Sequence, residues 1–113
     1  MAKRIYLASD HAGYKMKIFI RNYLIDQGIE VKDFGVLEMV ACDYPDYAYE
    51  MAKALVEDKD ALGIAVCGSG IGISIAMNKV KGVNCGLCHN ILSARKAKEL
   101  GCNSIAIGGR VLG

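Results

Sequence analysis

An apolar run that ends in a cysteine and a glycine-rich turn, residues 62–72, constrains the fold of this chain more than any other segment. The nearly continuous apolar stretch 62–67 is typical of a parallel strand that is buried on both faces. Cys67 ends that stretch, three glycines alternate with other residues behind it, and residues 73–80 can form a helix. A helix N-terminus carries unpaired N–H groups and partial positive charge, and glycines let a backbone approach an anion closely. The segment is therefore expected to bind a negative group beside a cysteine whose thiolate form the same field favours.

Strands and helices alternate along the whole chain. Short apolar or alternating segments predict strands, and apolar residues spaced three or four positions apart predict helices. Strands are expected at 4–8, 29–34, 62–67, 83–88 and 103–107, and helices at 13–27, 47–56, 73–81 and 91–100. In the first helix, one apolar face is expected to carry Met16, Phe19, Ile20, Tyr23 and Leu24.

This alternation predicts an α/β fold, namely a single-domain, Rossmann-like α/β/α sandwich around a five-stranded parallel sheet. Residues 1–113 are expected to form one domain. Four helices leave part of a five-stranded sheet uncovered, so either a subunit contact or a segment beyond residue 113 is expected to cover the rest.

Composition excludes several classes of function. A net charge of +2 and the absence of Trp argue against a nucleic-acid partner. No apolar run approaches the roughly 20 residues that span a bilayer, so no membrane partner is expected. The N-terminus leads directly into a strand and does not resemble a signal peptide, which favours a cytoplasmic protein.

The five cysteines do not form a recognisable metal or disulfide pattern. Cys85 and Cys88 have CxxC spacing, but there is no second CxxC and the pair falls in an expected strand. Strand packing is therefore the preferred interpretation for these two residues. We expect Cys42 and Cys102 to be structural as well.

Polar residues follow the ends of several expected strands. Ligands of parallel α/β sheets bind beyond the carboxyl ends of the strands, which meet at one edge. The candidates at this edge are Ser9-Asp10-His11 after the first strand, Cys67 to Gly72 after the third, His89-Asn90 after the fourth and Arg110 after the fifth. Their convergence at one edge is stronger support for a site than any single residue.

The same segments resemble the type B ribose-5-phosphate isomerases, in the wider family that includes the galactose-6-phosphate isomerase subunits. The resemblance covers essentially the whole chain. Its landmarks are Ser9-Asp10-His11-Ala12-Gly13, Asp43-Tyr44-Pro45, Cys67-Gly68-Ser69-Gly70-Ile71-Gly72-Ile73-Ser74, Asn78-Lys79 and Gly108-Gly109-Arg110.

The resemblance implies an enzyme that interconverts ribose 5-phosphate and ribulose 5-phosphate through an enediolate, without metal or cofactor. It also implies a homodimer, or a larger homo-oligomer, with sites at the subunit interface. The implied general base is Cys67, and Ser69 and His11 are further catalytic candidates. The implied substrate-binding residues are Asp10, His11, Tyr44, Gly68, Ser69, Gly70, Ile71, Gly72 and Arg110.

Two departures from the family pattern concern ring opening and phosphate binding. Leu100-Gly101 stands where the family usually has His-Asn, whose His assists opening of the furanose ring. His11, or else His89, is then a candidate for that step. The family also has phosphate-binding arginines in a C-terminal helix that residues 1–113 are not expected to contain, so Arg110 is the candidate that retains part of the phosphate contact.

Simpler interpretations of these residues stay open at this point. Cys67 could be a small buried hydrophobe, Ser69 a helix cap, and Asp10 the cap of the first helix. Tyr44 could be a turn residue and Arg110 a solvated charge.

Three other functions stay open too. The first is an isomerase of a six-carbon sugar phosphate such as allose or galactose 6-phosphate. The second is a catalytically impaired relative. The third is a nucleotide-binding module, which is disfavoured because the loop reads GxGxG and no acidic residue lies about 20 positions beyond it.

Overall fold

A computed structural model describes residues 4–35 and 44–109 of the chain and contains one five-stranded sheet. All strand pairs are parallel, and the order across the sheet is β2-β1-β3-β5-β4. The strands are β1 (Arg4–Ser9), β2 (Glu30–Asp33), β3 (Ala61–Cys67), β4 (Cys85–Leu87) and β5 (Ser104–Gly108). The helices are α1 (Tyr14–Asp26), α2 (Tyr44–Glu57), α3 (Ile71–Asn78) and α4 (Ile91–Glu99). The predicted α/β sandwich with a five-stranded parallel sheet is confirmed.

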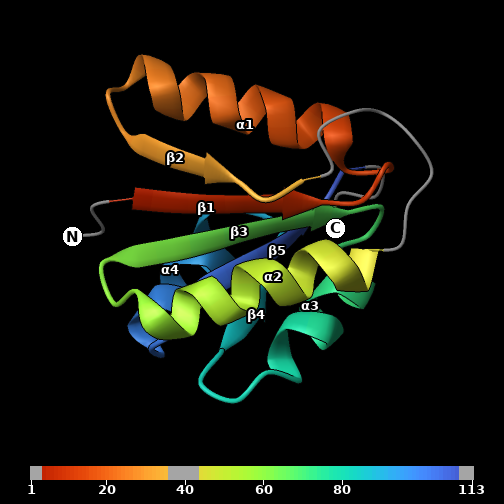
Figure 1. The fold of residues 1–113 in the computed structure, drawn as a ribbon, viewed down its shortest axis with the longest axis vertical. Coiled ribbons are helices and arrows are strands. Elements are labelled where there is room, and N and C mark those ends of the chain that lie inside the picture. The colour runs from red at the N-terminus through yellow and green to blue at the C-terminus, as the bar shows by residue number, and fades with distance from the viewer. Residues whose placement is uncertain (1–3, 36–43, 110–113) are drawn as a thin grey trace.

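Helices cover both faces of the sheet. Figure 1 shows α1 on one side of the sheet and α2 with α3 on the other. A side chain at Gly86 of β4 would meet Ala97 of α4, whereas Cys85 belongs to the cluster packed under α2 and α3. Because neighbouring residues of a strand face opposite ways, α4 lies on the same side as α1.

The main hydrophobic core lies between the sheet and the pair α2 and α3. Its buried members come from alternate positions of the strands and from the inner faces of both helices: Tyr6, Ala8, Ala48, Met51, Ala52, Leu55, Ala61, Ala65, Cys67, Ile73, Met77, Val83, Cys85 and Ala106. The many small residues bring α2 close to the sheet, and a Cβ at Gly63 would lie only 2.8 Å from a methyl carbon of Leu55.

Several predicted boundaries shift in the structure. Helix α2 begins at Tyr44, three residues before the predicted start, because Pro45 fits within the first turn of a helix instead of ending the loop before it. Helix α3 begins at Ile71, and β4 is limited to three residues. Gly28 lies two residues past α1 with φ of +78°, as expected for the glycine that ends a helix.

The predicted apolar face of α1 is partly wrong. Met16, Ile20 and Leu24 are half-buried, but Phe19 and Tyr23 are 71% and 58% exposed. The one fully buried side chain among the described residues of α1 belongs to Lys17. The helix is turned so that this lysine meets Asp33 at the end of β2, an ion pair that hydrophobic spacing alone does not indicate.

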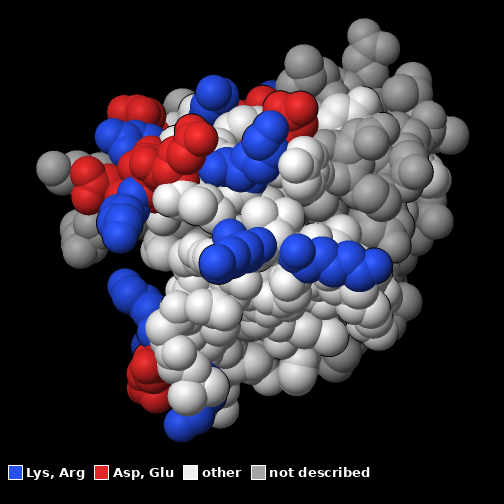
Figure 2. Space-filling view, turned by 60° about the horizontal axis from the view of Figure 1, so that its bottom comes forward, with Lys and Arg blue, Asp and Glu red and all other residues white. Residues whose placement is uncertain are grey.

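Figure 2 shows Lys and Arg side chains across the middle of the face turned toward the viewer, whereas Asp and Glu side chains lie mostly toward its left and upper edges. Ile71 and Ile75 of α3 are each more than half exposed. Among the described residues, no helix is both long enough and apolar enough to cross a membrane.

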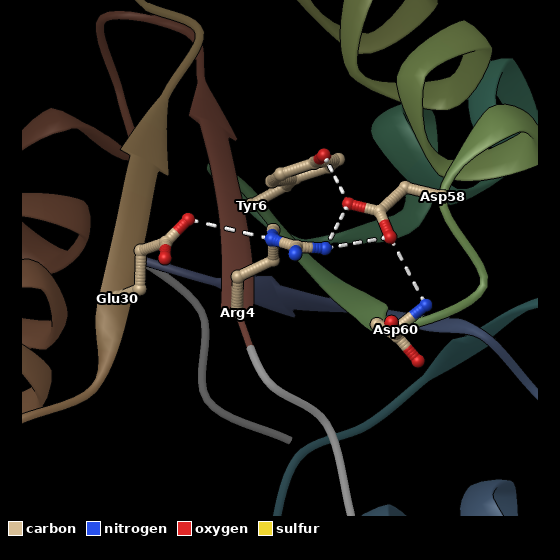
Figure 3. Close-up of polar contacts among 5 residues, drawn as sticks. All are labelled: Arg4, Tyr6, Glu30, Asp58 and Asp60. Atoms are coloured by element: carbon tan, nitrogen blue, oxygen red, sulfur yellow. Dashed lines mark hydrogen bonds and ion pairs between the residues drawn. The ribbon is translucent and has the colours of Figure 1, made fainter.

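A polar network joins the amino ends of β1 and β2 to the turn before β3 (Figure 3). Arg4 donates two hydrogen bonds to Asp58, at 2.8 and 2.6 Å, and Tyr6 donates a third at 2.6 Å. Hydrogen bonds from Arg4, and then from Tyr6, lower the pKa of Asp58 to about 2 from an ordinary value of 3.8. The hydrogen bond to Asp58 has the opposite effect on Tyr6, whose pKa it raises.

We expect Asp58→Asn to destabilise the fold in a pH-dependent way. Since the pKa of Asp58 is depressed in the folded state, its contribution is complete above about pH 5 and is lost as the pH falls from about 4 toward 2. Urea unfolding of wild type and the variant between pH 6 and pH 2.5 should show a free-energy difference that shrinks with acidity. Asp60→Asn is the matched control, and an unchanging difference for Asp58→Asn would contradict the argument.

Candidate functional site

The loops that follow β1, β3 and β5 are in direct contact at the carboxyl edge of the sheet. The N–H of Asp10 donates to the carbonyl of Val66 at 3.2 Å, and the N–H of Gly109 donates to the carbonyl of Cys67 at 2.7 Å. A Cβ at Gly68 would lie 3.7 Å from that of Ala12. The predicted convergence of these segments is therefore found in the structure.

Cys67 is the last residue of β3 and is only 5% exposed. Its sulfur accepts a hydrogen bond from the N–H of Gly70 at 3.2 Å. A backbone N–H of the glycine turn is therefore aimed at the sulfur, at the place where the sequence puts the turn and the cysteine side by side. The thiol thus has a specific polar contact beside the helix N-terminus, although it also packs in the core cluster.

The glycine turn holds the backbone in a shape that other residues adopt at a cost. Gly70 has φ of +83°, and a Cβ there would lie 2.9 Å from the backbone carbon of Ile107. The Ser69 hydroxyl accepts the N–H of Ile71 at 3.2 Å, whereas the residue at the N-cap position of α3 is Gly70. Ser74 donates the first bond within the helix, to the carbonyl of Gly70. The N–H groups of residues 71–73 precede this bond, so they have no partner within α3.

Asp10 and His11 stand beside this turn. Asp10 is 8% exposed, and its carboxylate accepts the N–H of Gly13 at 2.9 Å, so it does cap the entry to α1. His11 is half-buried, and its buried Nδ1 has no hydrogen-bond partner among the described residues.

Some predicted site residues are not placed together with this group. The side chain of Tyr44 and all of Arg110 lie outside what the structure describes. His89 is exposed and follows β4, on the far side of β5 from β1 and β3, and it lines a cavity that Ser69 and Ile71 of the turn also line. The structure therefore brings together Asp10, His11 and the turn from Cys67 to Gly72.

A mostly aliphatic cavity adjoins the glycine turn. It measures about 470 Å³ and is lined by Ser69, Ile71, Leu87, Cys88, His89, Asn90, Ile91, Ala94, Ile105, Ile107 and Gly108. It meets the glycine turn at Ser69 and Ile71, but Asp10, His11 and Cys67 do not line it. Its aliphatic walls suit a polar sugar poorly, so the residue cluster around Cys67 locates the candidate site better than the cavity does.

Cys85 and Cys88 are poor nucleophiles in this structure. Burial raises the pKa of Cys85 to about 11 and also raises the pKa of Cys88. Within residues 4–35 and 44–109, no three His, Cys, Asp or Glu side chains are arranged to hold a metal ion.

The sequence did not indicate how closely Gly13 and Gly109 approach neighbouring backbone at the carboxyl edge of the sheet. A Cβ at Gly13 would lie 2.5 Å from the carbonyl oxygen of Val66, and one at Gly109 would lie 3.1 Å from that of Ala12. Glycines at strand–helix junctions were the available signal, but sequence alone does not say which backbone they approach.

Comparison with known proteins agrees with this geometry. Residues 5–113 match the family model described as Ribose/Galactose Isomerase. The chain belongs to this family. It is 38% identical over 112 residues to ribose-5-phosphate isomerase B of Escherichia coli, covering 98% of this chain and 75% of that protein. It is also 38% identical over 110 residues to galactose-6-phosphate isomerase subunit LacB of Clostridium acetobutylicum, covering 96% of this chain but only 64% of the relative.

Solved structures of the family have the same fold. Ribose-5-phosphate isomerase B of Clostridium thermocellum aligns with a TM-score of 0.92 and 42% identity, over 97% of this chain and 75% of that one. A ribose 5-phosphate isomerase of Thermotoga maritima aligns with a TM-score of 0.94 and 37% identity, over 100% of this chain and 79% of that one. The family resemblance inferred from the landmark residues is thereby confirmed.

Two alanine substitutions in the turn should differ sharply in their effect on the free energy of unfolding. Gly70→Ala is expected to lower the free energy of unfolding by about 3 kcal/mol, because it combines a left-handed backbone with a clash against Ile107 and Leu87. Gly68→Ala meets only an ordinary contact and should change it by less than about 1 kcal/mol. Urea unfolding measures both, and equal losses would show that the turn is not shaped as described.

Proposed function

We propose that this chain is an aldose–ketose isomerase domain that interconverts ribose 5-phosphate and ribulose 5-phosphate. The observation that carries the proposal is the bond from the Gly70 N–H to the Cys67 sulfur, at the edge where Asp10 and His11 also lie. Family membership supports an isomerase of sugar phosphates, and the relatives' names include both ribose- and galactose-phosphate enzymes.

In the proposed mechanism, the sulfur of Cys67 removes the proton from C2 of the open-chain aldose and returns it to C1, while the hydroxyl proton on O2 passes to O1. The Gly70 N–H stabilises the thiolate before the transfer. Backbone N–H groups at the start of α3 stabilise the negative charge that develops on the enediolate oxygen. Each well-placed donor of this kind contributes about 3 kcal/mol to transition-state stabilisation.

The other residues bind and orient the sugar in this proposal. Ser69 contacts a sugar oxygen while its hydroxyl oxygen accepts the Ile71 N–H, since a hydroxyl can donate and accept at once. Asp10 uses one oxygen to cap α1 and offers the other to a sugar hydroxyl. Tyr44, the backbone of the turn and Arg110 complete the proposed contacts, and the working unit is proposed to be a homodimer or larger.

Ring opening is assigned to His11. Ribose 5-phosphate exists largely as a furanose, which must accept and release protons to open. His11 adjoins the Cys67 turn and has a buried nitrogen without a partner among the described residues. His89 is the alternative, since it follows β4 and lines the cavity that Ser69 also lines.

A substrate panel tests the proposed function. Protein from a host without its own ribose-5-phosphate isomerases should convert ribose 5-phosphate with a kcat/KM at least tenfold above those for allose 6-phosphate and galactose 6-phosphate, followed by NMR. A preference for a six-carbon substrate would replace the proposed substrate. No turnover of any of them, or of erythrose 4-phosphate, would support the impaired relative.

Erythrose 4-phosphate separates ring opening from proton transfer, because its phosphorylated O4 cannot close a furanose. His11→Asn should lower kcat/KM for ribose 5-phosphate about a hundredfold and that for erythrose 4-phosphate several-fold less. His89→Asn is the matched control and should change neither. The reverse pattern would assign ring opening to His89.

A further inference from the structure

A buried ion pair lies one strand away from the candidate site. The Lys17 ammonium of α1 is 2.7 Å from Oδ1 of Asp33 at the end of β2. The same carboxylate oxygen accepts the N–H of Gly35 at 2.9 Å, and the carbonyl of Gly35 accepts the N–H of Ser9 at 2.7 Å. These four residues, Lys17, Asp33, Gly35 and Ser9, are called the Asp33 anchor below.

The burial of the anchor is unusual. The Lys17 side chain is fully buried and that of Asp33 is 10% exposed, while Arg21 makes a longer contact of 3.3 Å to the second oxygen of Asp33. Buried ion pairs rarely stabilise a fold more than well-packed apolar residues would. The positive charge of Lys17 is best explained by its effect on Asp33. It balances the charge of the Asp33 carboxylate, which can then stay buried and accept a backbone N–H.

The anchor leads directly to the proposed substrate contacts. Strands β1 and β2 pair as far as Leu7 and Asp33, and the Ser9–Gly35 bond extends that pairing beyond the end of β2. Ser9 is followed immediately by Asp10, so the bond fixes the backbone from which Asp10 and His11 project.

The anchor also reaches helix α2. Gly35 has φ of +117°, and a Cβ there would lie 2.5 Å from ring carbons of Tyr47. The Asp33 carboxylate thus holds Gly35 in a left-handed shape between β1 and the first turns of α2.

We propose that Lys17 and Asp33 are positioning residues for substrate binding. Asp33, its charge balanced by Lys17, holds Gly35 so that the Gly35 carbonyl fixes Ser9 and, through it, Asp10 and His11. The proposal rests on the proposed function, since it assumes that Asp10 and His11 contact the sugar phosphate.

Two double variants separate the amide contact from the charge. Lys17→Met with Asp33→Asn removes both charges but leaves an amide oxygen to accept the Gly35 N–H. Lys17→Met with Asp33→Ala removes both charges and the acceptor. Arg21→Met is the matched control, because Arg21 touches the same carboxylate from a more exposed position.

The proposal predicts a split in kinetic constants. The Asn double variant and Arg21→Met should keep KM for ribose 5-phosphate within about threefold of wild type. The Ala double variant should raise KM at least tenfold with kcat changed less than threefold. A purely structural role would lower Tm in both double variants without separating their KM values, and equal KM values would overturn the proposal.

Amide hydrogen exchange gives a readout that does not require activity. Relative to the amide of Ala65 in β3, the Ser9 amide should exchange at least tenfold faster in the Ala double variant and at the wild-type ratio in the Asn double variant. An unchanged ratio in both would overturn the anchor. Wild type could also show the expected exchange but turn over no sugar phosphate. In that case the proposed function fails and the substrate-positioning role is overturned with it. The anchor then stands as a structural contact only.

Asp33→Glu keeps the experiment decisive if the Ala double variant does not fold. Glutamate retains the charge beside Lys17, but its longer side chain places the carboxylate away from the Gly35 amide. It should show the same rise in KM and the same faster Ser9 exchange. Wild-type values for Asp33→Glu would contradict the proposal.

Discussion

Close backbone packing at the carboxyl end of β3 is the constraint on which the candidate site depends. A Cβ at any of three glycines would crowd a neighbouring backbone segment. Gly13 lies against Val66, Gly70 against Ile107 and Gly109 against Ala12. These approaches bring the loops after β1, β3 and β5 together around Cys67. Because backbone sets the distances, the donor from Gly70 to sulfur is positioned before any ligand arrives.

The sequence predicts the architecture well because the physical signals are local. Buried parallel strands appear as apolar runs and amphipathic helices as periodic spacing, so element order and sheet type follow from the pattern alone. The convergence of Asp10, His11 and the Cys67 turn also follows, since parallel strands end at one edge. The family landmarks then indicate which of the residues at that edge carry chemistry.

What the sequence does not predict depends on contacts between distant segments. Lys17 looks like a surface lysine until Asp33 is placed beside it, and that ion pair turns α1 so that Phe19 and Tyr23 face outward. Which glycine approaches which carbonyl requires coordinates as well.

The segments that agree with the family and those that depart from its pattern belong to different steps of the proposed mechanism. The turn that surrounds Cys67 agrees with the family landmarks, and the fold agrees with solved relatives at TM-scores above 0.9. Leu100-Gly101 departs from the family pattern, and the chain spans 75% or less of the length of the two relatives compared above. Among the proposed steps, proton transfer is therefore the one to which the described residues contribute most groups, whereas Arg110, the proposed phosphate contact, lies outside the described residues.

The most direct test of the account is proton removal from C2 by Cys67. Ribose 5-phosphate deuterated at C2 can be mixed with an excess of wild-type protein or of Cys67→Ser, and breakage of the C2–deuterium bond followed by NMR. The account predicts that the serine variant binds the sugar with similar affinity but breaks this bond at least about a hundredfold more slowly, since a hydroxyl is a much weaker base than a thiolate. Bond breakage at the wild-type rate in the serine variant would contradict it.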